Sequence, residues 1–345
     1  MTAIRVGLAG YGVGGSVFHA PLIAATAGLR LTAVATRRRE NVERDWPGVR
    51  IASSAGELAS DPEVDMVVIS TPTTAHFDGA RAALEGGKHV VVDKPFTATV
   101  EEADELIHLA RRRGLLLSVY QNRRWDGGFL TVERLIRSGE LGEVYHFESH
   151  FDRFRPAVKG GWRDEAGPGS GILYDLGAHL VDQALRLFGL PDEVWADAFC
   201  QRPGARAIDY FHVVLSYGRR RAVLHGASLV REPGPHFAVH GSGGSFLKYG
   251  MDPQEDALRS GMRPAGPAWG AEPPDAYGTL VPADGNRKRI PTDPGDYPAF
   301  YRAMAAAIRS GSPVPVDPLD SRHGIALVIA AGESARDGRR IRVRP

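Results

Sequence analysis

Residues 4–15 read IRVGLAGYGVGG, and this stretch decides the fold. A run of aliphatic residues of strand length is followed at once by a G-x-G-x-x-G motif that begins at Gly10. Such a loop turns tightly, brings its backbone close to a pyrophosphate and aims a helix N-terminus at the phosphate charge. A merely structural turn is the alternative in a chain with 41 glycines, but the strand before the motif and the helical run after it favour dinucleotide binding. We expect cofactor contacts from Gly10, Gly12, Val13, Gly14 and Gly15.

Composition limits the classes of protein that fit. At about 150 residues per domain, a chain of 345 residues holds about two domains. Lys and Arg number 42 against 41 for Asp and Glu, so no bulk charge attracts nucleic acid or an acidic membrane. Cys200 is the only cysteine, which excludes an internal disulfide framework and a thiolate-rich metal site. Without a long apolar run or a signal-like start, the sequence predicts a cytoplasmic protein.

Up to about residue 122, short aliphatic runs alternate with longer amphipathic ones. The clearest helical pattern is Val100–Arg113, which Thr99 and Glu102 begin as a capping box. Continuous apolar strands that alternate with helices indicate a parallel sheet covered on both faces. We therefore expect residues 1–122 to form an α/β, doubly wound Rossmann domain that binds a dinucleotide. Its predicted strands are Ile4–Ala9, Leu31–Thr36, Met66–Ser70, His89–Val92 and Leu115–Val119.

After Asn122 the rhythm changes, and strand patterns follow one another with little helix between them. Their polar and apolar alternation indicates half-exposed antiparallel strands, usable as an oligomer face. Residues 123–345 are therefore expected to form a C-terminal α+β domain for substrate binding and homo-oligomerisation (dimer or tetramer), with a large, mostly antiparallel sheet. Residues 252–292 are rich in Pro, Gly and charge and are expected to be a long loop or cover. The predicted strands are Val144–Phe151, Glu193–Gln201, Tyr210–Tyr217, Arg221–Val230 and Phe237–His240, and the helices are Phe129–Arg137, Leu173–Phe188, Tyr297–Arg309 and Leu319–Arg336, where the closing helix can pack back on the first domain.

The end of the second predicted strand bears on the choice of cofactor. A unit that binds NAD usually places an acid about 20 residues after the glycine motif, to bond the ribose 2′-hydroxyl. This chain instead has Thr36, Arg37 and Arg38, followed by a third arginine. Hydroxyl and guanidinium groups bind a 2′-phosphate that a carboxylate would repel. A solvated, basic helix start is the alternative, but the pattern favours NADP.

Two short segments offer groups for chemistry. Lys94 follows the predicted strand His89–Val92, and ligands of such sheets bind beyond the carboxyl ends of the strands. A lysine there can hold a substrate oxygen and stabilise charge. Asp175 and His179 lie four residues apart on one predicted helix face, where a histidine beside a carboxylate can exchange a proton with an alcohol. An ordinary strand-end lysine and a helix-surface pair are the alternatives for these positions.

A third cluster, Tyr120–Asp126, follows the predicted strand Leu115–Val119 and is rich in hydrogen-bond donors. It suits a neutral ring of hydroxyl groups better than a fatty or aromatic alcohol. A polar junction between domains is the other interpretation. The expected substrate contacts are Tyr120, Asn122, Arg123, Trp162, Arg163, Asp175 and His179.

Together these motifs resemble the Gfo/Idh/MocA family of oxidoreductases along essentially the whole chain. The family's E-K-P motif corresponds to residues 93–95, with Asp93 one methylene shorter than the usual glutamate, and its D-x-x-x-H helix corresponds to Asp175 and His179. Residues 10–21, 117–126, 173–179 and 249–257 look most like those of NADP-dependent scyllo-inositol dehydrogenases within this family. The T-P-x-x-x-H nicotinamide loop matches residues 71–76, so the resemblance adds cofactor contacts from Thr71, Pro72, Thr73, His76, Asp93 and Lys94.

The resemblance implies hydride transfer between a ring carbon and a nicotinamide, without a metal. In that scheme His179 takes or gives the hydroxyl proton, Lys94 polarises the same oxygen, and Asp175 orients a sugar hydroxyl or the histidine. The substrate expected first is scyllo-inositol or its ketone. Two alternatives are an aldose or keto-sugar dehydrogenase of the same family and a non-catalytic NADP-binding sensor. A sensor would be expected to lose Lys94 or His179, and this chain keeps both.

Overall fold

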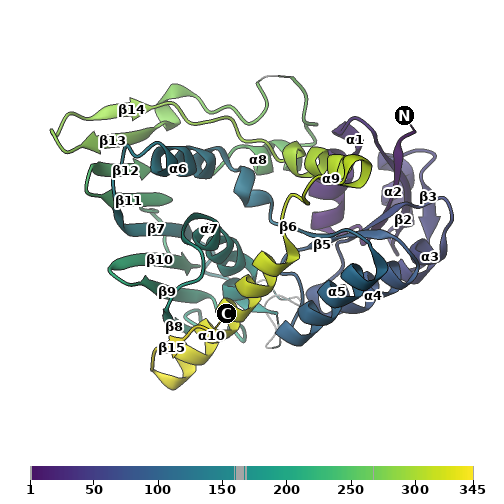
Figure 1. The fold of residues 1–345 in the computed structure, drawn as a ribbon, viewed down its shortest axis with the longest axis horizontal. Coiled ribbons are helices and arrows are strands. Elements are labelled where there is room, and N and C mark those ends of the chain that lie inside the picture. The colour runs from purple at the N-terminus through teal and green to yellow at the C-terminus, as the bar shows by residue number, and fades with distance from the viewer. Residues whose placement is uncertain (1, 159, 161–166, 168, 267, 345) are drawn as a thin grey trace. The chain divides into compact units, whose positions relative to one another are not determined.

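The computed structural model describes residues 2–158, 160, 167, 169–266 and 268–344. The chain divides into two compact units. The first comprises Met1–Asn122, Gln254–Trp269 and Asp296–Arg322. The second comprises Arg123–Pro253, Gly270–Gly295 and His323–Pro345. Each unit contains one sheet (Figure 1).

The first unit is built on a six-stranded, wholly parallel sheet in the order β3-β2-β1-β4-β5-β6. Its inner strands are mainly apolar because helices cover both faces, and Val6, Val68 and Val91 are fully buried. This confirms the predicted doubly wound sheet. The strands are β1 (Ile4–Ala9), β2 (Leu29–Ala35), β3 (Arg50–Ala52), β4 (Met66–Ile69), β5 (His89–Asp93) and β6 (Leu117–Tyr120).

Helix α5 shows how local sequence sets the boundaries of an element. The Thr99 side chain accepts a bond from the Glu102 backbone, the Glu102 side chain accepts one from Thr99, and Gly114 ends the helix with φ 64°. The predicted bounds, Val100–Arg113, are those observed. The other helices of this unit are α1 (Ala20–Ala25), α2 (Arg39–Asp45), α3 (Ala55–Ser60), α4 (His76–Glu85), α8 (Gln254–Arg259) and α9 (Pro298–Ser310), with α10 (Pro318–Asp337) assigned to the first unit only as far as Arg322.

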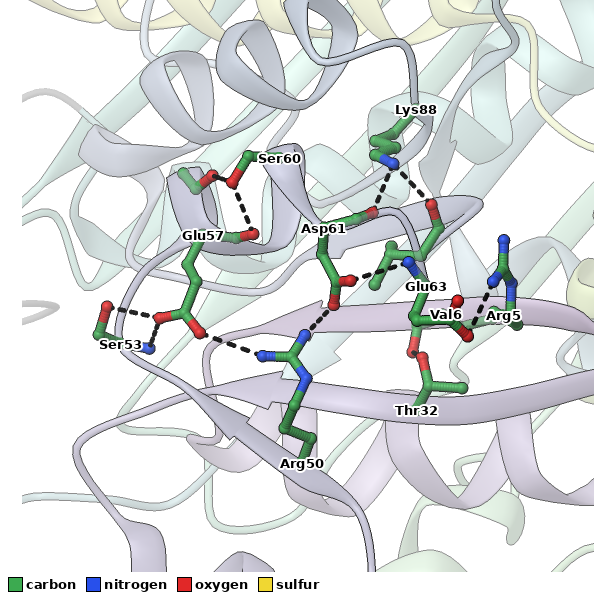
Figure 2. A network of polar contacts seen from close by, with 12 residues as sticks. Arg5, Val6, Thr32, Arg50, Ser53, Glu57, Ser60, Asp61, Glu63 and Lys88 are labelled. Carbon is green, nitrogen blue, oxygen red and sulfur yellow. Dashed lines mark hydrogen bonds and ion pairs between the residues drawn. The ribbon is translucent and has the colours of Figure 1, made fainter.

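A polar network ties the amino ends of these strands together (Figure 2). Arg50, at the start of β3, pairs with Glu57 at 3.1 Å and also with Asp61, and both partners lie on or just after α3. The Lys88 ammonium, just before β5, donates to the carbonyl oxygens of Asp61 (2.6 Å) and Val64 (2.8 Å). These contacts lie at the amino ends of the strands, whereas the glycine loop lies at the carboxyl end of β1, so we interpret the network as structural.

The second unit has a nine-stranded sheet in the order β14-β13-β12-β11-β7-β10-β9-β8-β15. Among the described strand pairs of this sheet, only the central β7–β10 pair is parallel, which confirms the predicted large, mostly antiparallel sheet. Helices α6 (Gly127–Arg137) and α7 (Ala178–Phe188) bury Phe129 and Leu180 in the same core as Phe147, Phe211 and Phe237 of the sheet. The strands are β7 (Val144–Asp152), β8 (Glu193–Phe199), β9 (Tyr210–Tyr217), β10 (Arg220–Ala227), β11 (Phe237–Gly241), β12 (Gly244–Lys248), β13 (Gly278–Pro282), β14 (Lys288–Ile290) and β15 (Ile341–Arg342).

The prediction of a long loop over residues 252–292 is wrong. The segment contains α8 and the two strands β13 and β14, which extend the sheet beyond β12. The sequence pattern of β13 is weak because a glycine (Gly278) and a proline (Pro282) stand at its two ends and leave only three residues between them. The pairing comes from non-local contacts: Leu280 is buried opposite Phe246, and a Cβ at Gly278 would collide with the Phe246 ring.

One buried histidine of this unit makes stability depend on pH. Burial lowers the pKa of His236 to about 3, and its Nδ1 donates to the His150 carbonyl oxygen at 2.7 Å. Because the folded-state pKa lies below the ordinary value, the unfolded chain gains the proton first as pH falls. Titration of His236 therefore leaves the free energy of unfolding unchanged above about pH 6.5. Between about pH 6 and 4 it lowers that free energy by about 1.4 kcal/mol per pH unit.

We expect His236→Asn to keep a donor for that carbonyl and to remove this titration. Urea unfolding at pH 4.5, 5.5, 6.5 and 7.5 should show a shallower fall of the free energy of unfolding in the variant than in the wild-type protein. Equal slopes would mean that other groups govern the acid sensitivity.

Candidate active site

The glycine loop lies at the carboxyl end of β1. Gly10 has φ 98°, and a Cβ at Gly10 would collide with the Ser70 carbonyl, while one at Gly15 would collide with the Gly10 carbonyl. A Cβ at Gly12 would meet no described atom within 4 Å, so the backbone there is open to an approaching ligand. The loop therefore has the close-packed flanks and open centre that a pyrophosphate needs.

A wide (π) helical turn, Gly14–His19, follows the loop and leads into α1. A second wide turn, Leu173–Gly177, leads into α7 in the other unit. Such turns are rare and often occur at functional sites. In the described part of the chain these are the two turns of this kind, and each coincides with a segment that the sequence predicts to be functional.

Two loops follow β4 and β5, and His76 joins them. The imidazole is buried, with Nδ1 2.9 Å from the Pro95 carbonyl oxygen and Nε2 2.9 Å from the Thr71 carbonyl oxygen. Thr73 is also buried, in the short turn before α4, and Pro72 lies between them. The side chain of His76 thus holds the predicted nicotinamide loop against the Asp93-Lys94-Pro95 turn.

The carboxylate of Asp93 is bonded within this edge of the sheet. Its Oδ1 accepts from the Lys94 backbone N–H at 2.8 Å, and its Oδ2 accepts from the Ser70 hydroxyl at 3.1 Å. Burial opposes ionisation, but His19, Lys94 and His76 together lower the pKa of Asp93 to about 2. Asp93 is therefore an anion that anchors the backbone beside Lys94.

At the end of β2 the Thr36 hydroxyl accepts from the Arg38 backbone N–H at 3.0 Å. The side chains of Arg37 and Arg38 are exposed, and no described carboxylate forms an ion pair with either of them. Two guanidinium groups and a hydroxyl thus stand at the strand end where a ribose would lie in this fold.

In the second unit Asp175 lies in the wide turn and His179 is buried at the start of α7. The ring of His179 lies 6.4 Å from that of Phe151, on β7. A π turn holds more residues per turn than an α-helix, so Asp175 and His179 are offset from the alignment that a regular helix predicts.

The Tyr120–Asp126 segment is more buried than the sequence suggests. Tyr120 and Asn122 belong to the first unit, while Arg123 belongs to the second, where it pairs with Asp126 at 3.1 Å and lies over the Phe151 ring at 4.8 Å. Trp162 and Arg163 lie outside the described residues. Sequence reasoning missed the buried, two-bonded Arg124–Asp182 pair, because its partners are 58 residues apart.

The structure brings the predicted cofactor residues together at the carboxyl ends of β1, β2, β4 and β5. Lys94 belongs to the first unit, and Asp175 and His179 belong to the second. In the described residues, no three His, Cys, Asp or Glu side chains are grouped so as to hold a metal ion. None of the described helices combines the length and apolar character needed to span a bilayer.

Known proteins of the same architecture match along both units. The NAD-binding Rossmann-fold model of the Gfo/Idh/MocA oxidoreductase family matches residues 4–121, and the C-terminal alpha/beta domain model of the family matches residues 133–343. The uncharacterized oxidoreductase YdgJ of Escherichia coli is 48% identical over 336 residues, 96% of each chain. The scyllo-inositol 2-dehydrogenase (NADP+) IolW of Bacillus subtilis is 42% identical over 341 residues, 98% of this chain and 95% of that protein.

Solved structures agree with this relationship. The oxidoreductase yvaA of Bacillus subtilis superimposes with a TM-score of 0.97 at 41% identity and 99% coverage of both chains. The YPO2259 oxidoreductase of Yersinia pestis gives a TM-score of 0.94 at 43% identity, covering 100% of this chain and 98% of that one. The chain belongs to the Gfo/Idh/MocA family of oxidoreductases.

Proposed function

We propose that the protein is an NADP(H)-dependent oxidoreductase that interconverts a cyclic polyol and its ketone, with scyllo-inositol and scyllo-inosose as the first choice. The observation that carries the proposal is the end-to-end similarity to the NADP+-dependent scyllo-inositol 2-dehydrogenase. The resemblance of residues 93–95 and 175–179 to the motifs of the family supports roles for Lys94, Asp175 and His179. A more distant relative, 29% identical over 189 residues, is the scyllo-inositol 2-dehydrogenase (NAD+) of Bacillus subtilis, so the cofactor has to be argued from the residues of this chain.

The first unit fits a dinucleotide on structural grounds. The open backbone at Gly12 would hold the pyrophosphate, and Thr36, Arg37 and Arg38 would hold the 2′-phosphate. The Thr71–His76 segment would lie beside the nicotinamide. Bound NADP(H) would supply the hydride acceptor or donor for the reaction.

Removing the two arginines should separate the two cofactors. A charge-assisted phosphate contact contributes on the order of 1.5–3 kcal/mol, which corresponds to roughly 10- to 150-fold in affinity. The double variant Arg37→Ala, Arg38→Ala should therefore weaken NADPH binding in that range and leave NADH binding almost unchanged. Fluorescence titration with both cofactors measures this, and an equal loss for both would show that the arginines are structural.

In the proposed reaction the second unit would supply His179 and Asp175, and the first unit would supply Lys94. His179 would take the hydroxyl proton during oxidation or return it during reduction, because an imidazole changes protonation state near neutral pH. The Lys94 ammonium would polarise the same oxygen, and Asp175 would orient the histidine or a neighbouring hydroxyl. The proposal therefore includes that Lys94 and His179, which belong to different units, contact the same substrate molecule.

A substrate panel tests the proposal directly. Turnover would be measured with inositols, inososes and aldoses, each with NADP(H) and NAD(H). Highest kcat/KM for scyllo-inositol or scyllo-inosose with NADP(H) is the expected result. Preference for an aldose would replace the substrate class, and NADPH binding without turnover of any member would favour a sensor.

We also propose that the protein is a homo-oligomer, associating through the sheet face that α6 and α7 leave uncovered (Figure 1). On β8 this face exposes Trp195 (37%) and Phe199 (44%), and such aromatic groups are enriched at interfaces. Light scattering should show that Trp195→Glu reduces the oligomer size. Met262→Glu, at an exposed apolar residue of the first unit, is the matched control and should not change the oligomer size.

A further inference from the structure

His19 ends the wide turn after the glycine loop, and no step of the proposed function uses it. Its side chain is fully buried. Nδ1 lies 2.6 Å from the Tyr301 hydroxyl, and Nε2 lies 3.4 Å from Oδ2 of Asp93, within ion-pair range. A buried imidazole needs polar partners at its nitrogens, so these two contacts define how the ring is oriented.

Aromatic rings hold the plane of this imidazole. The ring centroid of Tyr120 lies 4.5 Å from that of His19, and the ring of Tyr301 meets His19 edge-on at 6.2 Å. Tyr120 in turn packs edge-on against Phe300 at 5.0 Å. Close packing of this kind restricts the side-chain rotamer, so Nε2 is held toward Asp93.

The chemistry of the groups favours a single direction for these polar contacts. Asp93 is ionised, and a carboxylate can only accept, so the Nε2–H tautomer of His19 would direct its hydrogen at Oδ2 across the 3.4 Å contact, which is longer than a regular hydrogen bond. Burial raises the pKa of Tyr301 well above its usual value, which keeps the phenol protonated and able to donate to Nδ1. This series of polar contacts therefore runs from the Tyr301 phenol through the His19 imidazole to the Asp93 carboxylate.

The carboxylate at the end of this chain is the one that anchors Lys94. Asp93 accepts from the Lys94 backbone through Oδ1 and from Ser70 through Oδ2. A Cβ at Gly14 would lie 2.7 Å from Oδ2, so the same carboxylate packs against the glycine loop. Because Oδ1 bonds the Lys94 backbone directly, rotation of Asp93 would displace the residue that carries the candidate ammonium group.

We propose that His19 is a positioning residue: together with Tyr301 it holds the Asp93 carboxylate in place and thereby fixes the backbone from which the Lys94 ammonium reaches the substrate oxygen. The role given to Lys94 rests on the proposed function. The contacts among Tyr301, His19 and Asp93 do not depend on it.

Two amide substitutions separate the contact of His19 with Tyr301 from its contact with Asp93. The glutamine amide in His19→Gln reaches about as far as Nε2 and can still contact Asp93, whereas the shorter amide in His19→Asn reaches about as far as Nδ1 and contacts only Tyr301. Misplacing a reacting group by about 1 Å can cost about 10²-fold, so we expect His19→Asn to lower kcat by roughly 10- to 100-fold. The dissociation constant for NADPH should change by less than about 3-fold, and His19→Gln should keep kcat within about 5-fold of the wild-type value.

His108→Asn, on the exposed face of α5, is the matched control and should not change kcat. A merely structural role for His19 would lower kcat equally in the Gln and Asn variants, in step with their loss of thermal stability. That result, or wild-type kcat in His19→Asn, would overturn the proposal.

A measurement without substrate keeps the proposal testable if those variants fail to fold or if the wild-type protein turns over no member of the panel. Long-range ¹H–¹⁵N spectra of histidine-labelled protein with NADPH should show the Nε2–H tautomer for the histidine whose Nδ1 signal moves in Tyr301→Phe. An Nδ1–H tautomer would contradict the proposed direction of the contacts from Tyr301 through His19 to Asp93. Absent turnover with the expected tautomer would instead overturn the proposed function alone.

Discussion

Replacement of Lys94 or of His179 by alanine is expected to lower kcat by about 10²–10⁴-fold, the range that general acid–base catalysis contributes. The dissociation constant for NADPH should change far less, because the glycine loop and the residues at the end of β2 provide the main proposed contacts with the cofactor. His179 is buried beside Phe151, so alanine there also removes packing. His179→Gln, which keeps most of the volume, separates that effect from the loss of proton transfer.

Steady-state kinetics and NADPH titration of each variant provide the measurement. Lys288→Ala and His108→Ala, both at exposed positions, are the matched controls and should retain wild-type kcat. Wild-type turnover in Lys94→Ala or in His179→Gln would remove that residue from the proposed mechanism. A loss of NADPH binding as large as the loss of kcat would instead indicate a damaged cofactor site.

The parts of this fold that the sequence predicts well are those with local causes. The bounds of α5 follow from Thr99, Glu102 and Gly114, all of which act within one turn of the helix they delimit. The glycine loop follows from a strand, a motif and a helical run that are contiguous in the chain. Strands β13 and β14 escaped prediction because their order comes from pairing with β12 at a sheet edge, which leaves only a weak signal in their own residues.

The candidate site shows the same limit. Lys94 and the arginines after β2 are predictable because the carboxyl ends of parallel strands meet at one edge of the sheet. The role of His19 is not, since its partner Tyr301 lies 282 residues away and nothing in the spacing links them. Its only sequence signal is a histidine in the first helical run, four residues after the last glycine of the motif. The sequence shows that a histidine occupies this position, but only the structure identifies its partners.

Discrimination by hydroxyl groups is expected to be the largest effect in the substrate series. A site built to bond a substrate hydroxyl rejects an analogue that lacks it by up to about 10⁴–10⁵-fold, since the polar groups of the site are then left unpaired. Lys94 and His179 would keep their contact with the single hydroxyl of cyclohexanol, but Asp175 and the other groups proposed to bind the remaining ring hydroxyls would lose their partners. Scyllo-inositol should therefore exceed cyclohexanol in kcat/KM by about this factor.

Epimers provide the finer comparison. Myo-inositol differs from scyllo-inositol in the direction of one hydroxyl, so it loses one hydrogen bond rather than all, and its kcat/KM should fall by a smaller factor. Steady-state kcat/KM for scyllo-inositol, myo-inositol, D-glucose and D-xylose with NADP+ measures the series. If an aldose leads it, the cyclitol assignment is wrong, while the roles of Lys94 and His179 can still hold, because the same proton transfer and the same oxygen contact serve any secondary alcohol on a polyhydroxylated ring.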